Sequence, residues 1–368
     1  MRILANSEHL SPNTGISVQT LEVTEDLAKR GHQIDLLYMR DGPYRERYQQ
    51  FCHSMDEIPL LDLGVHHALR DGPKLVPAVR QGIRDHPDVI YVNRYRPLPW
   101  ALSVGALTRS PVVCHMHGLI GAEHPMVNWS LGRVTTRFIC VSNFVRDRFL
   151  ALGGRADRTD VIHNGIDPAA YPVGGDDERR SARAELGLPP DRTLVMFYGR
   201  IDPSKGIDVL VDSLAGLGTT GRPVELVVVG SAHDDEWADR ILDSCAVPVH
   251  RLTMRTDVVT PLHASDVVVV PSVYDDPFPR TVIEAMCTGR PVIATTTGGI
   301  PEALTGQFAA MLVPPGDPVA LTAKLVEVLD WRDERPELGA QCADHVAQNF
   351  SMRSMVDAIE QRLVDAAG

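Results

Sequence analysis

Residues 266–294 read DVVVVPSVYDDPFPRTVIEAMCTGRPVIA. The stretch opens with an apolar run from Asp266 to Val270, passes through a loop with two carboxylates, and continues into a helix expected at Thr281 to Cys287. A second apolar run follows at Pro291 to Ala294. A strand, a helix and a second strand in this order form the βαβ unit of a parallel sheet, and uninterrupted apolar runs are typical of strands covered on both faces. The stretch therefore predicts a doubly wound α/β domain.

The same alternation of strands and helices extends over the rest of the chain in two series. The first series of expected strands comprises Arg2 to Asn6, Ile34 to Tyr38, Val89 to Val92, Val112 to His115 and Phe138 to Val141. The second comprises Leu194 to Tyr198, Val224 to Val229, Asp266 to Val270, Pro291 to Ala294 and Ala310 to Val313. A stretch rich in Pro, Gly and Asp separates the two series, and 368 residues exceed one ordinary domain.

We therefore predict two Rossmann-like domains that face each other across a cleft. The N-terminal domain is expected over residues 1–165, together with an amphipathic helix at 352–366. Residues 166–191 are expected to be a linker that contains a short helix from Glu178 to Leu186. The C-terminal domain is expected over residues 192–351.

The composition narrows the possible functions. The net charge of -12, without basic clusters, argues against a nucleic-acid partner and against an anionic membrane surface. No apolar run approaches the roughly 20 residues that a membrane span needs. The six cysteines form no CxxC pair, which fits a reducing compartment and no metal site. We expect a cytoplasmic protein without membrane association, and the sequence leaves its oligomeric state open.

The loop and helix of the opening stretch carry the strongest candidate site. A proline at 279 suits the first turn of a helix, whose amides at Arg280 and Thr281 could hold a phosphate oxygen. Glu284, one turn further on, could accept from the two hydroxyls of a ribose, and Asp276 from sugar hydroxyls. The alternative is that these carboxylates only stabilise the helix dipole.

A second candidate site follows the apolar run at Leu194 to Tyr198. Arg200 and Lys205 stand there in a tight, glycine-flanked loop, and both cations suit a diphosphate whose negative charge grows as it leaves. The alternative is a surface loop with a glycine at a helix end. The loop lacks the GxxxxGK[ST] pattern of a P-loop.

Two weaker signals lie in the first half of the chain. Gly15 follows the first expected strand and would allow close approach of a ligand to a helix N-terminus, although an ordinary turn explains it equally well. His115 and His117 end another expected strand on one face. For His117 we favour a hydrogen bond to a substrate. For His115 a structural role is an open alternative. A zinc site is disfavoured, because no third ligand stands at suitable spacing.

Together these residues resemble the family 4 retaining glycosyltransferases with the two-domain GT-B fold, over nearly the whole chain. The resemblance rests on shared motifs: Gly15, Arg30-Gly31-His32, the strand end at His117, Val141 to Val145, Val161 to Asp167, Gly199-Arg200 with Lys205-Gly206, Asp266 to Ser272, the carboxylates Asp276 and Glu284, Glu284 to Met286 with Gly289 to Ala294, and Gly298 to Glu302.

The resemblance implies roles for individual residues. Arg200 and Lys205 would bind the donor diphosphate, Glu284 the ribose, and Asp276 the transferred sugar. Gly15 would approach the phosphates, and His117 would touch the sugar near its anomeric carbon. Arg251 and Met254 would lie beside the nucleobase. Asn93, Arg94, Glu123 and His124 are the candidates for binding the acceptor.

Two departures from the family pattern alter the sugar pocket. Asp276 stands where the family usually has the first Glu of an E-x7-E motif, which shortens the reach by one methylene. Pro279 follows Phe278 where the family usually has Gly, which removes one amide donor.

The function that the resemblance implies is a metal-independent, retaining hexosyltransferase that needs no cofactor. It would use a nucleotide diphosphate sugar, a UDP-sugar before a GDP-sugar, and a soluble small acceptor such as a natural product or an aminocyclitol. The departing diphosphate would accept the acceptor's proton. The alternatives are a sugar-nucleotide epimerase on the same fold and a non-catalytic nucleotide-sugar binding protein.

Overall fold

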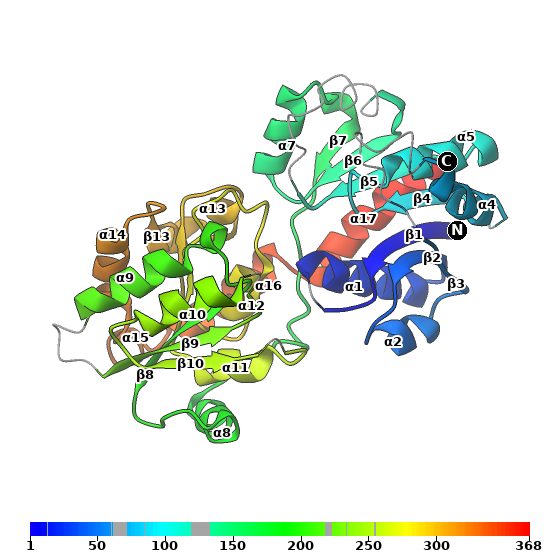
Figure 1. Cartoon of the computed structure of the whole chain (residues 1–368). Helices are drawn as coiled ribbons and strands as arrows, with labels where there is room; N and C mark the ends of the chain where they lie inside the picture. The colour runs from blue at the N-terminus through cyan, green and yellow to red at the C-terminus, as the bar shows by residue number, and fades with distance from the viewer. Residues whose placement is uncertain are drawn as a thin grey trace. The chain divides into compact units, whose positions relative to one another are not determined.

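The computed structural model describes residues 1–12, 14–59, 61, 72–84, 86–118, 133–217, 223–232, 234–253 and 255–368. The chain divides into two compact units. The N unit comprises Met1–Asn164 and Arg353–Gly368, and the C unit comprises Gly165–Met352. Figure 1 shows a parallel sheet with its helices in each unit. The predicted class, two α/β domains with parallel sheets, is thereby confirmed.

The N unit is built on a sheet that has seven parallel strands in the described residues, in the order β3-β2-β1-β4-β5-β6-β7. The strands are β1 (Arg2–His9), β2 (Gln33–Arg40), β3 (Ser54–Glu57), β4 (Val89–Val92), β5 (Val112–Met116), β6 (Arg137–Cys140) and β7 (Thr159–Val161). The helices include α1 (Gly15–Lys29), α2 (Arg45–Gln49), α4 (Val76–Arg84), α5 (Leu98–Thr108), α7 (Asn143–Ala151) and α17 (Met352–Ala367).

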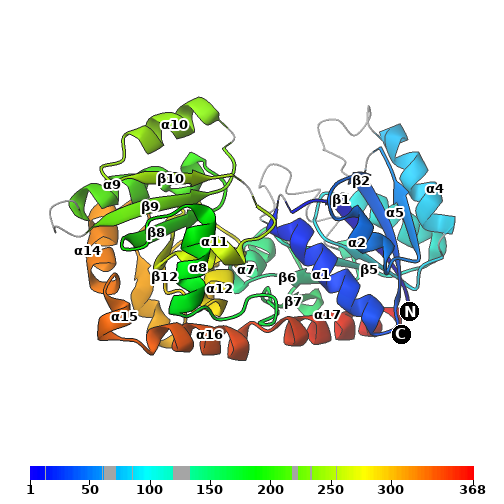
Figure 2. The same cartoon turned by 90° about the horizontal axis from the view of Figure 1, so that it is seen from below.

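Helix α17 brings the end of the chain back to helix α1. Gln19 of α1 donates to the Met355 sulfur at 2.9 Å, and Arg30 Nη1 donates to Asp357 at 2.6 Å and to Glu360 at 2.7 Å. Figures 1 and 2 show the two helices side by side. The apolar side of α17, which includes Met355 and Ile359, is buried, so the N unit is completed by residues from both ends of the sequence.

The C unit has a sheet of six parallel strands among its described residues, in the order β10-β9-β8-β11-β12-β13. They are β8 (Thr193–Tyr198), β9 (Val224–Val229), β10 (Val249–Leu252), β11 (Val267–Val270), β12 (Val292–Thr295) and β13 (Leu312–Val313). The helices include α8 (Asp176–Leu186), α9 (Ile207–Leu217), α10 (Asp235–Asp243), α11 (Val259–Ala264), α12 (Arg280–Cys287), α13 (Ile300–Ala303), α14 (Pro318–Val328), α15 (Trp331–Glu334) and α16 (Leu338–Asn349).

Some expected elements differ from the observed ones. The strand expected at 310–313 is shorter, because Gly306–Met311 form a 3-10 helix and only Leu312–Val313 pair with β12. Strands β3, β7 and β10 were not predicted. Each is an edge strand that is not fully buried, so it lacks the continuous apolar run of a central strand.

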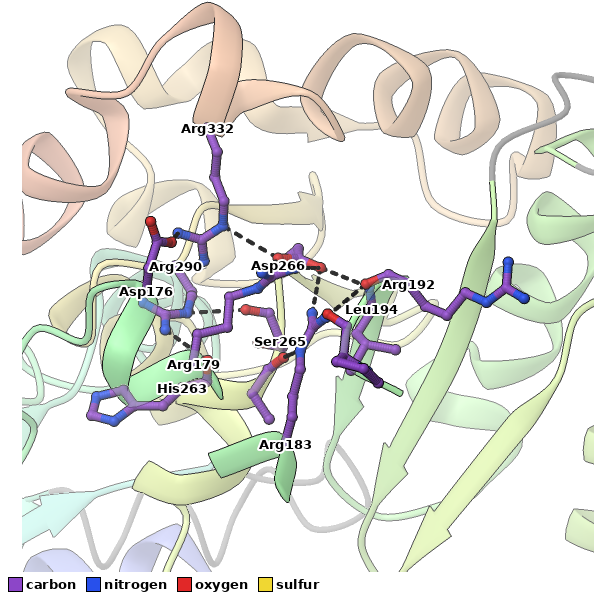
Figure 3. A network of polar contacts seen from close by, with 12 residues as sticks. Asp176, Arg179, Arg183, Arg192, Leu194, His263, Ser265, Asp266, Arg290 and Arg332 are labelled. Atoms are coloured by element: carbon purple, nitrogen blue, oxygen red, sulfur yellow. Dashed lines mark hydrogen bonds and ion pairs between the residues drawn. The ribbon is translucent and has the colours of Figure 1, made fainter. Parts of the chain in front are cut away.

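A charged network lies where β11 begins. The Asp266 carboxylate is paired with Arg179 at 2.8 Å, with Arg183 at 2.8 Å and with Arg332 at 3.2 Å, and it accepts from the Leu194 amide at 2.8 Å. Figure 3 shows the arginines arriving from α8 and α15. Burial alone would raise the pKa of Asp266, but the surrounding guanidinium groups, Arg183 first, lower it below its usual value. The network joins α8 and α15 to the two central strands of the sheet.

A fourth arginine of this network, Arg290, is fully buried and bonds to the backbone. Its guanidinium donates to the carbonyl oxygens of Ser265 at 3.0 Å, Gly174 at 2.7 Å and His263 at 2.7 Å (Figure 3). Burial lowers the pKa of Arg290 to about 9. Because Gly174 belongs to the stretch expected as a linker, this arginine fixes part of that stretch against the rest of the C unit.

Candidate active site

The loops after β8 and β11 meet at the carboxyl edge of the C unit's sheet, since these strands are parallel neighbours. The Ser204 carbonyl accepts from the amides of Val273 at 3.0 Å and Tyr274 at 3.2 Å. Gly206 has φ +68°, and a Cβ atom there would lie 2.0 Å from the Pro271 carbonyl oxygen. Only glycine fits this approach, so the sequence fixes the two loops against each other.

Lys205 and Asp276 come together at this contact. The Lys205 Nζ donates to Asp276 Oδ2 at 2.5 Å, and Asp276 is 8% exposed. The Asp276 carbonyl accepts from the Gly299 amide at 2.7 Å. Gly298, at φ +57°, lies so close that a Cβ atom there would be 2.1 Å from the same carbonyl oxygen. Two of the predicted site residues, from two different loops, are therefore in direct contact, and the loop that carries Asp276 is also bonded to Gly299.

Helix α12 places the next group of predicted residues. It begins at Arg280 after Pro279 at the N-cap, and the first amides of a helix have no acceptor within it. Arg280 Nε donates to Glu284 Oε1 at 3.1 Å, and both residues are buried. The Thr281 hydroxyl donates to the Tyr198 carbonyl at 3.4 Å, which ties the helix start to the end of β8.

Sequence reasoning missed Tyr171, whose hydroxyl donates to Glu284 Oε1 at 3.3 Å. Tyr171 lies in the stretch expected as a linker, and no local signal marked it. Its bond orients the carboxylate that the resemblance assigns to the ribose.

Two other predicted donor residues lie apart from these contacts. The Arg200 side chain is 64% exposed and forms an ion pair with Asp202 at 3.3 Å. Arg251, at the end of β10, pairs with Asp239 and, at 3.1 Å, with Asp235, both on α10. Met254 lies outside the described residues.

The N unit contains a small open pocket at the carboxyl edge of its sheet. The walls come from the end of β1, the first turns of α1 and the segment after β4, and they include Asn6, Glu8, Ser17, Thr20, Asn93 and Arg94. Asn93 and Arg94, consecutive residues that are both predicted to bind the acceptor, line this pocket, while Glu123 and His124 lie outside the described residues. Gly15 is the first residue of α1, and the preceding Thr14 caps the helix by accepting from the Ser17 amide at 3.2 Å.

His115 and His117 lie at the end of β5, with ring centroids 4.0 Å apart. His115 is fully buried, its Nδ1 is 2.7 Å from the Tyr91 hydroxyl, and burial lowers its pKa to about 3. His115 is therefore neutral at physiological pH and packs in the core. His117 is 8% exposed.

The residues that the structure describes contain no group of three or more His, Cys, Asp and Glu side chains arranged to hold a metal ion. None of their helices is both long enough and apolar enough to span a membrane.

Comparison with known proteins places the chain in a family. The family described as Glycosyltransferase Family 4 matches residues 13–170, and the one described as Glycosyl transferases group 1 matches residues 192–330. A D-inositol 3-phosphate glycosyltransferase from Corynebacterium efficiens is 25% identical, over 95% of this chain and 92% of its own length. The enzyme of the same name from Mycolicibacterium smegmatis is 34% identical over 212 residues, which are 55% of this chain and 46% of that protein.

Solved structures share the fold. The crystal structure of Anabaena HepE in complex with UDP-glucose matches with a TM-score of 0.85 and 22% identity, over 99% of this chain and 100% of that one. Sucrose-phosphate synthase from Thermosynechococcus elongatus matches with a TM-score of 0.80 and 23% identity, over the whole of both chains. With its two parallel-sheet units and both family matches, the chain belongs to the family 4 type of glycosyltransferases and has the GT-B fold.

Proposed function

We propose that this glycosyltransferase moves a hexose-type sugar from a UDP-sugar to a hydroxyl group of a small soluble acceptor, with retention of the anomeric configuration and without a metal ion. The observation that carries the proposal is the contact between Lys205 and Asp276. An ammonium group suits a diphosphate, and a carboxylate accepts hydrogen bonds from sugar hydroxyls. The cation and the carboxylate lie 2.5 Å apart. A nucleotide diphosphate sugar could therefore place its phosphate beside the cation and the adjoining sugar beside the carboxylate.

The remaining donor groups come from α12 and the loop after β8. The first amides of α12 suit a phosphate oxygen, and Glu284 suits the ribose hydroxyls. The exposed Arg200 side chain would turn toward the diphosphate and bind it through its guanidinium group. The choice of UDP draws support from Anabaena HepE, which shares the fold and was solved with UDP-glucose. A GDP-sugar is the alternative donor.

In the proposed reaction the bond between the anomeric carbon and the diphosphate oxygen breaks, while the acceptor oxygen bonds to the same face of that carbon. The acceptor's proton passes to the departing phosphate oxygen. Lys205, Arg200 and the α12 amides stabilise the negative charge that develops on the diphosphate. His117 would hydrogen-bond the transferred sugar. Since the protein itself supplies the positive charge, the proposal requires no cofactor.

The test compares Lys205→Ala with the matched control Lys29→Ala, whose side chain is 66% exposed on α1. Loss of a charge-stabilising donor should lower kcat/KM by about 100- to 1,000-fold, and Arg200→Ala should act in the same direction. The control should keep its activity. Turnover is measured with UDP- and GDP-sugars, with and without EDTA, and the anomeric proton coupling of the product reports retention. Full activity of Lys205→Ala would refute the role of the contact, and epimer formation from donor alone would favour the epimerase alternative.

A further inference from the structure

The cationic side chains of the candidate active site are paired with carboxylates. Among the described residues, three pairs lie at the carboxyl edge of the C unit's sheet: Arg200 with Asp202 at 3.3 Å, Lys205 with Asp276 at 2.5 Å, and Arg280 with Glu284 at 3.1 Å. A diphosphate that binds one of these cations must compete with a carboxylate and then lie beside it. A paired cation therefore favours a ligand that also satisfies its partner.

The pair of Lys205 and Asp276 stands where the phosphate and the sugar of a donor would meet. The pair of Asp202 involves the Arg200 side chain, which is 64% exposed, so water screens it. Glu284 is assigned to the ribose, away from the bond that breaks. Asp276 is 8% exposed and in direct contact with its cation. It is therefore the carboxylate that faces the reacting end of the diphosphate.

Lys205 is the partner that can move. Its ammonium group ends a flexible four-carbon chain, and the side chain is 28% exposed. The Asp276 backbone is held, since its carbonyl accepts from the Gly299 amide at 2.7 Å and a Cβ atom at Gly298 would lie 2.6 Å from its nitrogen. The ammonium group therefore has two alternative acceptors, the fixed carboxylate before a donor binds and a phosphate oxygen afterwards.

The donor and the product of the proposed reaction present different groups to Asp276. In the donor, sugar hydroxyls donate hydrogen bonds to the carboxylate. After transfer the sugar is gone, and the phosphate oxygen that held it carries the acceptor's proton. That proton is then lost to water, because a terminal phosphate is largely doubly ionised at neutral pH. The product thus places an additional negative charge beside a carboxylate that has lost its hydrogen-bond donors.

We infer that Asp276 discriminates between the donor and the product: it gives up Lys205 to a nucleotide diphosphate sugar and takes it back from the nucleotide diphosphate that transfer leaves behind. The inference rests on the proposed function and adds to it a determinant of product release. A like charge within about 4–6 Å changes an ionic equilibrium by about ten- to a thousandfold. Because Lys205 is partly exposed to water, we expect an effect of about tenfold here.

The test compares UDP with UDP-glucose by calorimetry on the full chain, with GDP and GDP-glucose in parallel. Asp276→Asn removes the charge and keeps the size of the side chain, so it should tighten binding of the nucleotide diphosphate by about tenfold. The nucleotide sugar loses its carboxylate acceptor at the same time and should bind no more tightly than to the wild type. Since a misfolded variant cannot gain affinity, the tightening separates this role from a merely structural one.

Two further variants locate the effect. Asp275→Asn makes the same charge change at the neighbouring, more exposed position and should keep the affinity for UDP within about twofold of the wild type. In the Lys205→Ala background, Asp276→Asn should tighten UDP by less than it does in the wild type, because the competition for the ammonium group is absent.

The outcomes separate the inference from the proposed function. The inference is overturned if Asp276→Asn leaves the affinity for the nucleotide diphosphate unchanged or weaker, or tightens the nucleotide sugar equally. An equal gain in Asp275→Asn, or an undiminished gain without Lys205, would also overturn it, while sugar transfer could still stand. Failure of the wild type to bind any of the nucleotide sugars would instead count against the proposed function.

Discussion

Replacing Asp266 by Asn should destabilise the C unit strongly. The substitution keeps the size of the side chain and an oxygen for the Leu194 amide, but it removes the negative charge that three arginines share. The side chains of Asp266 and Arg183 are 5% and 1% exposed, so water cannot replace the lost partner. Removing one partner from a buried ion pair costs about 3–5 kcal/mol.

The expected loss is visible in a melting experiment. A domain of this size loses about 2–4 °C of Tm per kcal/mol, so Asp266→Asn should lower the transition by about 6–20 °C in calorimetry. Asp243→Asn, at an exposed position of α10, is the matched control and should melt within about 2 °C of the wild type.

The pH dependence of this difference gives a second check. The folded-state pKa of Asp266 is lowered, so its contribution is present above the unfolded pKa and is lost as the pH falls through the folded one. The gap between wild type and variant should be full at neutral pH and should shrink below about pH 4. If Asp266→Asn has the same Tm as the Asp243→Asn control at pH 7, the reasoning is refuted. The positive charges of the four arginines would then not need the carboxylate for stability.

Three further perturbations test other features. Gly298→Ala should lower transferase activity by displacing the Asp276 loop, because the new Cβ atom would lie 2.1 Å from the Asp276 carbonyl oxygen. Gly187 has a similar positive φ but open space around it, so Gly187→Ala should cost only about 1 kcal/mol of stability. The free energy of unfolding of the wild type should fall as the pH drops from about 6.5 toward 3, because the buried His115 imidazole stays neutral while the unfolded one takes up a proton. His115→Gln should show a smaller fall over this range. Equal pH profiles of the two proteins in urea titrations would contradict this. Arg30→Ala should speed hydrogen exchange in α17 with a stability loss of about 1 kcal/mol, and unchanged exchange there would show that apolar packing alone holds the helix.

The sequence predicted the central strands well and the edge strands poorly. Val267–Val270 form an apolar run because both faces of β11 are covered, and this run is readable without a structure. Strand β10 has the sequence VHRL and is partly exposed, so its composition resembles that of a loop. Strand β3 has the sequence SMDE, and only its pairing with β2 defines it.

The candidate site shows the same division between local and long-range information. Lys205 and Asp276 could each be found from the sequence, because strand ends, glycines and helix starts mark their loops. Their direct contact depends on the parallel pairing of β8 with β11, which only the fold supplies. Tyr171 reaches Glu284 across more than a hundred residues, and no local pattern could predict that bond.

The return of α17 to α1 has a consequence for how the chain is made. Domains usually fold in the order of their synthesis, N-terminal first. Here the contacts of Gln19 and Arg30 with α17 cannot form until Met352–Ala367 has left the ribosome, whereas Gly165–Met352 is a continuous segment that is translated before it. The C unit can therefore complete its fold before the N unit. The N unit, although its first residues are translated earlier, stays incompletely folded until α17 is available.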